Sequence, residues 1–147
     1  MKIDSIQNGV VIDHITAGYG MRLYELLNLA SLDVSVAIIK NVASKKMGKK
    51  DIIKIDADIE LNLDVIGFVD PEATVNIIKN GMLLEKKSID MPETLTNVIK
   101  CKNPRCITSC EQELDNIFKL TDKKNKVYRC IYCETKAQIQ SHFILID

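Results

Sequence analysis

Four cysteines in two close pairs are the feature of this sequence that most constrains its fold. Cys101, Cys106, Cys130 and Cys133 follow the spacing C-x4-C-x23-C-x2-C. Each short spacing places two thiolates on one turn, and a hairpin between the turns would bring all four around a tetrahedral zinc ion. Four thiolates leave no coordination position open for water, so we expect a structural zinc ion rather than a catalytic one.

Other interpretations of the cysteines stay open at this point. Four cysteines alone are also compatible with an iron–sulfur cluster, although zinc is favoured. Unrelated free thiols and disulfides are the remaining alternatives. The fifth cysteine, Cys110, is expected to be a buried or surface thiol, because four ligands already complete the tetrahedron.

Composition bears on the compartment and on the partners of the chain. The first residues, MKIDSIQNGVVIDHI, carry charges where a secretory signal needs an apolar run, and no stretch approaches the roughly 20 apolar residues of a membrane span. We therefore expect a reducing cytoplasm, in which paired cysteines bind metal more often than they form disulfides. Twenty basic and twenty acidic residues cancel, which argues against nucleic acid or a membrane as a partner.

The distribution of cysteines divides the chain. All five lie between residues 101 and 133, whereas residues 1–90 have none and are rich in Ile, Val and Leu. The segment DMPETLTN, residues 90–97, is interpreted as a linker because Pro92 blocks helix continuation and small polar residues follow. We predict two domains, 1–92 and 97–147. A domain of about 50 residues usually needs a staple, which the metal would supply.

Hydrophobic patterning in the first domain predicts an α/β sandwich with a mainly antiparallel sheet. Helical spacing covers residues 19–30, and β-branched residues predict strands over 34–42 and 51–57. Asn80-Gly81 between two apolar runs predicts a hairpin, and alternation around Asn8-Gly9 predicts β structure bent at a glycine turn. The predicted apolar stripe of the helix comprises Met21, Leu23, Tyr24, Leu27 and Ala30.

The remaining segments are shorter. Residues 59–69 alternate as in a strand but also allow a short helix near residues 63–68. In the second domain, IFKL, VYRC and HFILI predict short strands, and TDKKNK between the first two predicts a solvated turn. The second domain is therefore expected to be small and all-β.

Three polar clusters in the first domain are candidates for a ligand site. Asp13-His14 ends an apolar run, Lys54 lies inside an apolar strand near Lys49 and Lys50, and Asn76 and Lys86 lie on the two arms of the predicted hairpin. Carboxylate, amide and ammonium groups suit the hydroxyl and phosphate groups of a nucleotide. The alternative is a set of ordinary surface pairs, a solvated loop and lysines whose stems lie along apolar surface.

The usual nucleotide fingerprints do not occur. Neither GxxxxGK[ST] nor GxGxxG is present, so the residues alone indicate only a small-anion site. An enzyme that uses Asp13-His14 as an acid–base pair ranks low, because no nucleophile or open metal position accompanies the pair.

Five segments taken together resemble the regulatory chain of aspartate carbamoyltransferase. They are VVIDHI, MGKKDIIKI, PEATVN, the cysteine framework and CIYCE, and they match in order and nearly end to end. The resemblance implies an α+β chain: a ferredoxin-like allosteric domain, with a sheet backed by two helices, followed by a zinc domain. It also favours a helix at residues 63–68.

The resemblance further implies a chain without catalytic activity. Members of the family bind CTP as inhibitor and ATP as competing activator, and UTP often assists inhibition. Their holoenzyme joins two catalytic trimers through three regulatory dimers, with the zinc domain holding the catalytic chain. The expected partners are therefore the catalytic chain, a second copy of this chain and nucleotides.

Site residues follow from the resemblance by position. It implies base contacts from residues 3–6, ribose and base-edge contacts from Asp13 and Lys54, and phosphate contacts from His14, Asn76 and Lys86, with Lys50 nearby. The full implied nucleotide set is Ile3, Asp4, Ser5, Ile6, Val11, Asp13, His14, Lys50, Lys54, Asn76, Ile78, Leu83 and Lys86. Two departures bear on effector preference. Gly81 stands where the family can carry tyrosine, and Asp4-Ser5 replaces a commoner Glu-Ala pair.

The cysteine turns gain a partner role in the same way. Asn103, Arg105, Tyr132 and Glu134 stand on or beside them and match the interface with the catalytic chain, although they also suit ordinary solvated loops. The alternative function is a nucleic-acid-binding zinc ribbon. It would use Lys123, Lys124, Lys126 and Arg129, but the neutral net charge and the lack of a basic, aromatic-rich face argue against it.

Overall fold

The first part of the chain forms one sheet covered on one side by helices. The computed structural model describes residues 6–111 and 113–137, and the chain divides into two compact units, Met1–Asp90 and Met91–Asp147. The elements of the first unit are β1 (Gly9–Thr16), α1 (Gly20–Leu26), the 3-10 turn η1 (Leu29–Ser31), β2 (Val36–Ser44), β3 (Gly48–Ile55), α2 (Leu63–Val69), β4 (Thr74–Lys79) and β5 (Met82–Ser88).

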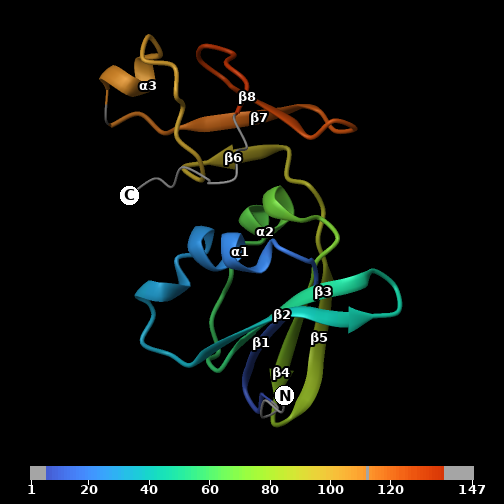
Figure 1. The fold of residues 1–147 in the computed structure, drawn as a ribbon. Helices are drawn as coiled ribbons and strands as arrows, with labels where there is room; N and C mark the ends of the chain where they lie inside the picture. The colour runs from blue at the N-terminus through green and yellow to red at the C-terminus, as the bar shows by residue number, and fades with distance from the viewer. Residues whose placement is uncertain (1–5, 112, 138–147) are drawn as a thin grey trace. The chain divides into compact units, whose positions relative to one another are not determined.

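The strand order of this sheet is β2-β3-β1-β4-β5, and every pair is antiparallel. The sequence β1-α1-β2-β3-α2-β4 with β3 and β1 at the centre is the ferredoxin-like arrangement, and β5 extends it through a hairpin. Both helices lie on the same face of the sheet (Figure 1). The predicted antiparallel α/β sandwich is confirmed.

Burial alternates along the strands because one sheet face meets the helices. Val10, Ile12 and Ile15 of β1 are at most 3% exposed, and Ile53 and Ile55 of β3 lie beside them with no exposed surface. Residues between them, such as Val11, point to the opposite face. Apolar area removed from water on the helix face is the main stabilising term of this unit.

The two helices contribute unequally to that core. Every residue from Val65 to Val69 in α2 is buried, and the Asn62 side chain caps the helix by accepting from Asp64 N at 3.1 Å. The helix expected near residues 63–68 is confirmed. In contrast, α1 is shorter than predicted: it ends at Leu26, and Asn28 adopts a left-handed conformation with φ 56°.

The predicted helical stripe was therefore partly wrong. Leu23 is fully buried, but Met21 is 42% exposed and Ala30 lies beyond the helix in η1. Leu29 enters the core instead, at 2% exposure. The left-handed turn at Asn28 ends the 3.6-residue period, so positions after it no longer follow the helical stripe.

The two predicted turns have different outcomes. Asn80 and Gly81 have φ values of 53° and 73°, as a two-residue hairpin turn requires, so the predicted hairpin is confirmed. Gly9, by contrast, is not a turn residue but the first residue of β1. A side chain does not fit at this position, because a Cβ added to Gly9 would collide with the carbonyl oxygen of Ile55.

A fully buried carboxylate ties three segments of the first unit together. Asp51 Oδ2 accepts from Gly18 N and Gly20 N, and Asp51 Oδ1 accepts from Asn41 N, all at 3.0 Å. Three N–H donors converge on two oxygens, which a carboxylate satisfies and an amide does not. Asp51 thereby holds the start of α1 and a bulge of β2 against β3.

The second unit is a small three-stranded sheet. Its elements are β6 (Thr94–Thr96), α3 (Ile107–Cys110), β7 (Ile117–Asp122) and β8 (Val127–Cys130), and the antiparallel order is β6-β7-β8. The strands predicted at 117–120 and 127–130 and the turn between them are confirmed. The strand predicted from HFILI, residues 142–146, lies outside the described residues.

The segment interpreted as a linker is in fact the first strand of this sheet. Leu95 of β6 is 1% exposed and pairs with Phe118, and Glu93 O accepts from Leu120 N at 2.8 Å. Tyr128 Oη donates to Pro92 O at 2.6 Å. Pro92 lies between two strands, β5 and β6, and the alternating residues after it add to the second sheet. Over the described residues, no helix is both long and apolar enough to cross a membrane.

We expect Asp51→Ala to lower the free energy of unfolding of the first unit by at least about 3 kcal/mol, because three N–H donors lose the carboxylate that accepts from them, at about 1–3 kcal/mol each. Urea unfolding monitored on the first unit measures this change. Asp56→Ala, at an exposed position five residues along the same segment, serves as the control and should stay within about 0.5 kcal/mol of the parent. Equal effects of the two substitutions would contradict the role given to Asp51.

Candidate metal centre and nucleotide site

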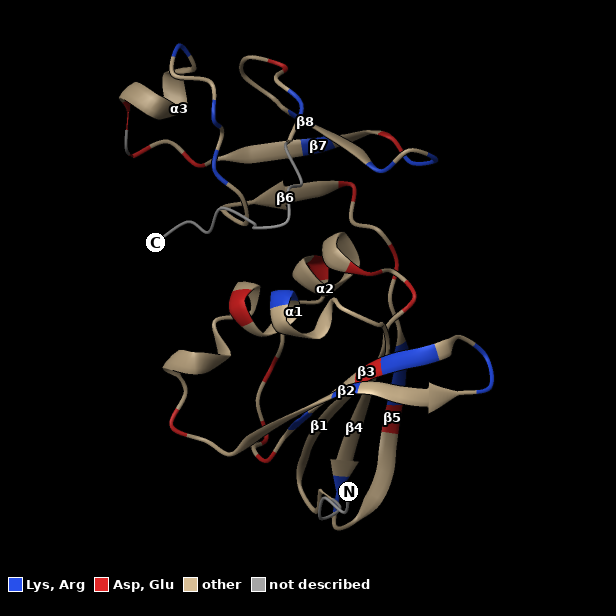
Figure 2. Ribbon diagram, in the orientation of Figure 1, with Lys and Arg blue, Asp and Glu red and all other residues tan. Residues whose placement is uncertain are grey.

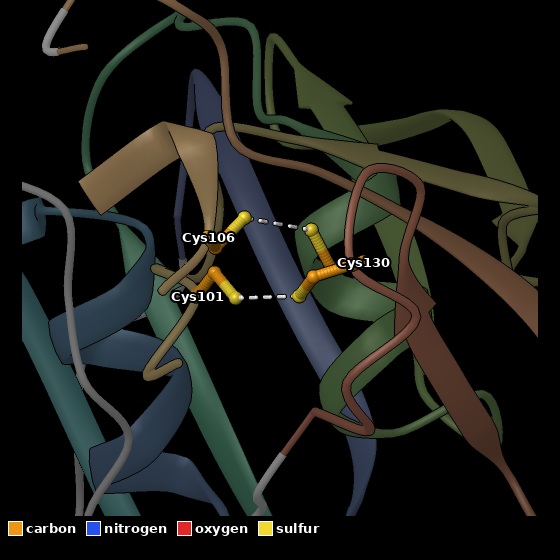
Figure 3. A group of neighbouring side chains, drawn as sticks. Cys101, Cys106 and Cys130 are labelled. Carbon is orange, nitrogen blue, oxygen red and sulfur yellow. Dashed lines mark hydrogen bonds between the residues drawn. The ribbon is translucent and has the colours of Figure 1, made fainter. Parts of the chain in front are cut away.

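The four paired cysteines converge at one point of the second unit. Their sulfur atoms all lie within 4.8 Å of one another. Cys101 Sγ is 3.5 Å from Cys133 Sγ, and Cys106 Sγ is 3.7 Å from Cys130 Sγ, so each contact joins the two turns (Figure 3). A tetrahedral ion with metal–sulfur bonds of about 2.3 Å needs sulfur atoms about 3.8 Å apart. The donor set and its spacing therefore fit a single structural metal ion.

Backbone hydrogen bonds shape the first turn, CKNPRC. Asn103 O accepts from Cys106 N at 3.0 Å and from Ser109 Oγ at 2.8 Å, while Asn103 Oδ1 accepts from Arg105 N at 3.0 Å. This turn leads into α3, whose N-cap residue is Cys106. The Asn-Pro-Arg sequence thus forms the loop that turns two thiols toward one ion.

The second turn, CIYC, follows directly from β8. Cys130 O accepts from Glu134 N at 2.9 Å, and Glu134 has a left-handed φ of 63° that reverses the chain. Asn103 Nδ2 donates to Thr135 Oγ1 at 3.3 Å and so links the two turns directly. Arg129 also stabilises the second turn, because its Nη1 donates to Glu134 O at 3.0 Å.

The thiols differ in their readiness to ionise. Burial raises the pKa of Cys101 to about 12 and also raises that of Cys130. Burial opposes ionisation of Cys133 as well, but the hydroxyl and backbone N–H of Thr135 outweigh it and lower the pKa of Cys133 to about 6. A metal ion must displace the remaining thiol protons, so its affinity falls with decreasing pH. Cys110 is exposed and lies outside the cluster, as expected.

Candidate nucleotide residues of the first unit form a row across four strands. Lys54 of β3 pairs with Val11 of β1, Val11 pairs with Asn76 of β4, and Asn76 pairs with Lys86 of β5. Directly paired residues share a sheet face, and this face is the one opposite the helices. Four residues separated by up to 75 positions in the sequence thus become neighbours.

A bulge brings two more predicted residues to the same face. Ile78 pairs with Leu83, and the register shifts between Ile77 and Ile78. Leu83 and Lys86 are an odd number of residues apart, so a regular strand would put them on opposite faces. Because of the extra residue, Leu83 lies on the same face as its partner Ile78, and Lys86 lies on that same face with its partner Asn76.

The charged end of this face lies at a second bulge, in β1. Lys50 Nζ contacts Asp13 Oδ1 at 2.9 Å, and His14 adopts a left-handed φ of 57° where the register shifts. His14 Nδ1 lies 3.0 Å from Thr74 Oγ1. Burial opposes ionisation of Asp13, but Lys50 and the His14 N–H outweigh it and lower the pKa of Asp13. Basic residues also gather on the turn between β2 and β3 (Figure 2).

One polar atom on this face has no partner. Asn76 Oδ1 is buried and makes no hydrogen bond. An unpaired buried amide costs about 1–3 kcal/mol, so such atoms are commonly satisfied by a ligand or ordered water. Among the residues expected around the base, Ile3, Asp4 and Ser5 lie outside the described residues, and Ile6 packs beside Gly9.

The Gly81 departure has a local structural reason. Gly81 N donates to Gln7 O at 2.9 Å, and Asn80 N donates to Asn8 Oδ1 at 3.2 Å. A Cβ on Gly81 would lie 2.9 Å from Gln7 Oε1. The hairpin turn therefore holds the segment before β1, and a larger residue would have to move Gln7.

The predicted interface residues divide into two kinds. Arg105, Tyr132 and Glu134 are exposed, whereas Asn103 is half-buried and holds the first turn together. Two further residues beside the cysteines, Ile107 and Ile131, are 49% and 47% exposed and were not among the predicted interface residues. The signal was an isoleucine directly after Cys106 and another directly after Cys130. Asp51 and Thr135 were not predicted either, because the partners of Asp51 and the contact of Thr135 with Asn103 join segments that are distant in the sequence.

The Asp13–Lys50 pair gives a pH-dependent prediction. Because the folded pKa of Asp13 is lowered, its contribution to stability is present above the unfolded pKa, near 3.8, and is lost as the pH falls through the folded value. We expect Asp13→Asn to cost about 1 kcal/mol in the free energy of unfolding at pH 7, and this difference to shrink below pH of about 4.

Urea unfolding of the parent and of Asp13→Asn between pH 2.5 and 7 measures the difference in their free energies of unfolding. Both proteins release metal in acid, so this effect cancels when the two free energies are subtracted. The exposed residue Asp33 supplies the control: Asp33→Asn should follow the parent throughout. A difference between Asp13→Asn and the parent that is independent of pH would contradict the assignment.

Comparisons with known proteins agree with both units. Residues 1–90 match the family model described as the aspartate carbamoyltransferase regulatory chain, allosteric domain, and residues 93–143 match the metal binding domain of the same chain. These ranges follow the two units closely.

Similar curated proteins are also aspartate carbamoyltransferase regulatory chains. The chain is 50% identical over 134 residues to the aspartate carbamoyltransferase regulatory chain of Clostridium botulinum, covering 91% of this chain and 92% of that protein. It is 47% identical over 135 residues to that of Clostridium tetani, covering 91% and 94%. It is 42% identical over 139 residues to that of Bifidobacterium longum, covering 95% and 100%. The chain therefore belongs to the family of aspartate carbamoyltransferase regulatory chains, the non-catalytic subunits of that enzyme.

Proposed function

We propose that this chain binds Zn²⁺ at the four cysteines and CTP, ATP or UTP on the open face of the first sheet. Through these two units it regulates the catalytic chain of aspartate carbamoyltransferase in pyrimidine biosynthesis. The first unit acts as the nucleotide-binding allosteric domain, and the second unit, which includes β6, acts as the zinc domain that contacts the catalytic chain. CTP inhibits and ATP competes with it.

Zinc is supported by the donor set. Four sulfur ligands suit Zn²⁺ better than Mg²⁺ or Ca²⁺, which prefer oxygen. The contacts of 3.5 and 3.7 Å across the two turns agree with one tetrahedral ion. When bound, the ion supplies folding free energy rather than catalysis, and Cys101, Cys106, Cys130 and Cys133 hold it.

The nucleotide site is supported by the chemistry of the residue row. Lys54 and Lys86 lie at either side of Val11 and Asn76, so two ammonium groups flank one apolar and one amide side chain. Asp13 and Lys54 would contact the ribose and the edge of the base. The phosphates would be contacted by His14, Asn76 and Lys86. The unpaired Asn76 Oδ1, or its amide nitrogen after a flip, is a ready contact for such a ligand.

The apolar members of the site complete the set. Val11, Ile78 and Leu83 would contact the flat base, and Leu83 is 57% exposed on this face. Lys50, paired with Asp13, is positioned to approach a phosphate if the nucleotide replaces that contact. Residues Ile3, Asp4, Ser5 and Ile6 would read the base edge through their backbone groups.

Assembly follows from the regulatory role. A regulatory chain of this enzyme implies the catalytic chain as its partner, and we propose that a second copy of this chain completes a dimer in the cytoplasm. Arg105, Tyr132 and Glu134 would contact the catalytic chain from the cysteine turns, whose hydrogen bonds limit the entropy lost on docking. Asn103 would support that surface by holding the first turn.

Coupling requires differential affinity. A nucleotide shifts the enzyme only if it binds one quaternary state more tightly, and such coupling is typically about 1–3 kcal/mol. The single observation that carries the proposal is the alignment of Lys54, Val11, Asn76 and Lys86 on one open sheet face. The nucleic-acid-binding alternative is not favoured, because the chain carries equal numbers of basic and acidic residues and both of its units match the regulatory chain of aspartate carbamoyltransferase.

We predict that Lys86→Ala weakens CTP binding about tenfold, equivalent to about 1.4 kcal/mol, because a phosphate loses a charged contact. Titration calorimetry measures this affinity. Zinc content and association with the catalytic chain should not change. Lys79→Ala is the matched control, since Lys79 is exposed at the end of neighbouring β4 and lies off the row. Unchanged CTP affinity in Lys86→Ala would contradict the nucleotide assignment.

Removal of zinc is expected to unfold the second unit and leave the first one folded, because such ions supply on the order of 10–16 kcal/mol of apparent folding free energy. Hydrogen exchange after chelation should show loss of protection in β6, β7 and β8 and retention in β1 and β3. Cys130→Ser should lower zinc content by elemental analysis, whereas Cys110→Ser should not. Retained protection of the second unit after complete chelation would refute this expectation.

A further inference from the structure

A cavity of about 130 Å³ lies on the helix side of the first sheet. Its floor is Val10, Val75 and Ile77, and its wall is Ile59, Leu61 and Leu63 from the segment that leads into α2. For comparison, an apolar cavity of about 150 Å³ in another protein holds benzene. This cavity therefore has room for a small molecule with an apolar body.

The cavity lies on the opposite face of the sheet from the proposed nucleotide row, next to the same strands. Val10 and Val75 directly precede Val11 and Asn76 in the sequence, and Lys87 of β5 pairs with Val75 just as Lys86 pairs with Asn76. Successive strand residues point to opposite faces. The cavity and the row thus use the same strands but share no side chain, so the cavity is not part of the nucleotide site.

Two charged residues, Glu60 and Lys87, complete the lining. Lys87 is half-buried, whereas Glu60 and the neighbouring Lys86 are exposed. Among the described residues, Lys87 forms no ion pair with a carboxylate. A half-buried ammonium beside an apolar wall has lost part of its hydration without gaining a counter-charge, so it favours an anion. The exposed carboxylate of Glu60 stays hydrated and is screened by solvent.

We propose that this cavity is a second small-molecule site, which binds a compound with a short apolar body and one anionic group. The apolar body would contact Val10, Val75 and Leu61, and the anionic group would pair with Lys87. The site is independent of the proposed nucleotide function, because its contacts come from the other face of the sheet.

Hexanoate is a suitable probe, since it combines a short alkyl chain with a carboxylate. Titration of the full zinc-loaded chain, followed by methyl NMR, should give saturable shifts at Val10, Leu61 and Val75 with a dissociation constant on the order of 1–10 mM. Hexylamine, which has the same alkyl chain and the opposite charge, should bind at least about threefold more weakly. Absence of saturable shifts, or equal shifts at the exposed Met82 and Leu84, would overturn the proposal.

Adjacent lysines on opposite faces provide the matched variants. Lys87→Gln should weaken hexanoate binding about threefold or more and leave CTP affinity unchanged, whereas Lys86→Gln should do the reverse. Ile59→Phe, which fills the cavity, should abolish the hexanoate shifts without lowering the unfolding midpoint. Equal effects of the two lysine substitutions on hexanoate would refute the site. Failure of CTP to bind the parent chain would instead count against the nucleotide proposal alone.

Discussion

The hydrogen-bonded pairing of β1 with both β3 and β4 is the constraint on which the first unit depends. It buries Val10, Ile12 and Ile15 under the helices, and the same register lines up Val11 with Lys54 and Asn76 on the other face. A shift by one residue would exchange the two faces, exposing the core and burying the lysine. The register that buries the core therefore also fixes the relative positions of the residues in the proposed nucleotide site.

Bulges modify this regular pattern where charged residues lie close together. His14 in β1 and Asn41 in β2 both have left-handed φ values, and both lie beside the β3 segment that carries Lys50 and Asp51. Lys50 pairs with Asp13 on one side of the sheet, while Asp51 on the other side holds the backbone around α1 and β2. A nucleotide that disturbs the Asp13–Lys50 contact would therefore act next to the residue that anchors α1.

The second unit depends on a different kind of interaction. Its apolar core is small, with Leu95, Phe118 and Tyr128 as its large, almost fully buried members. Cross-linking of the two cysteine turns by a metal ion compensates for that small core. The turns also display Ile107, Ile131 and Tyr132 at the surface, which gives a metal-stabilised loop pair the apolar and aromatic character of a protein-binding surface.

The sequence by itself determined the features that depend on local chemistry. The cysteine spacing predicted the metal cluster, Asn80-Gly81 predicted the hairpin, and β-branched runs predicted strands, because each signal lies within a few residues. Family resemblance supplied the list of nucleotide residues, but it did not explain their arrangement. Only the tertiary structure decided that Lys54, Asn76 and Lys86 form one row, that Asp51 receives three N–H groups, and that the supposed linker is β6. These facts depend on strand register, bulges and pairing between distant segments, which local propensity does not specify.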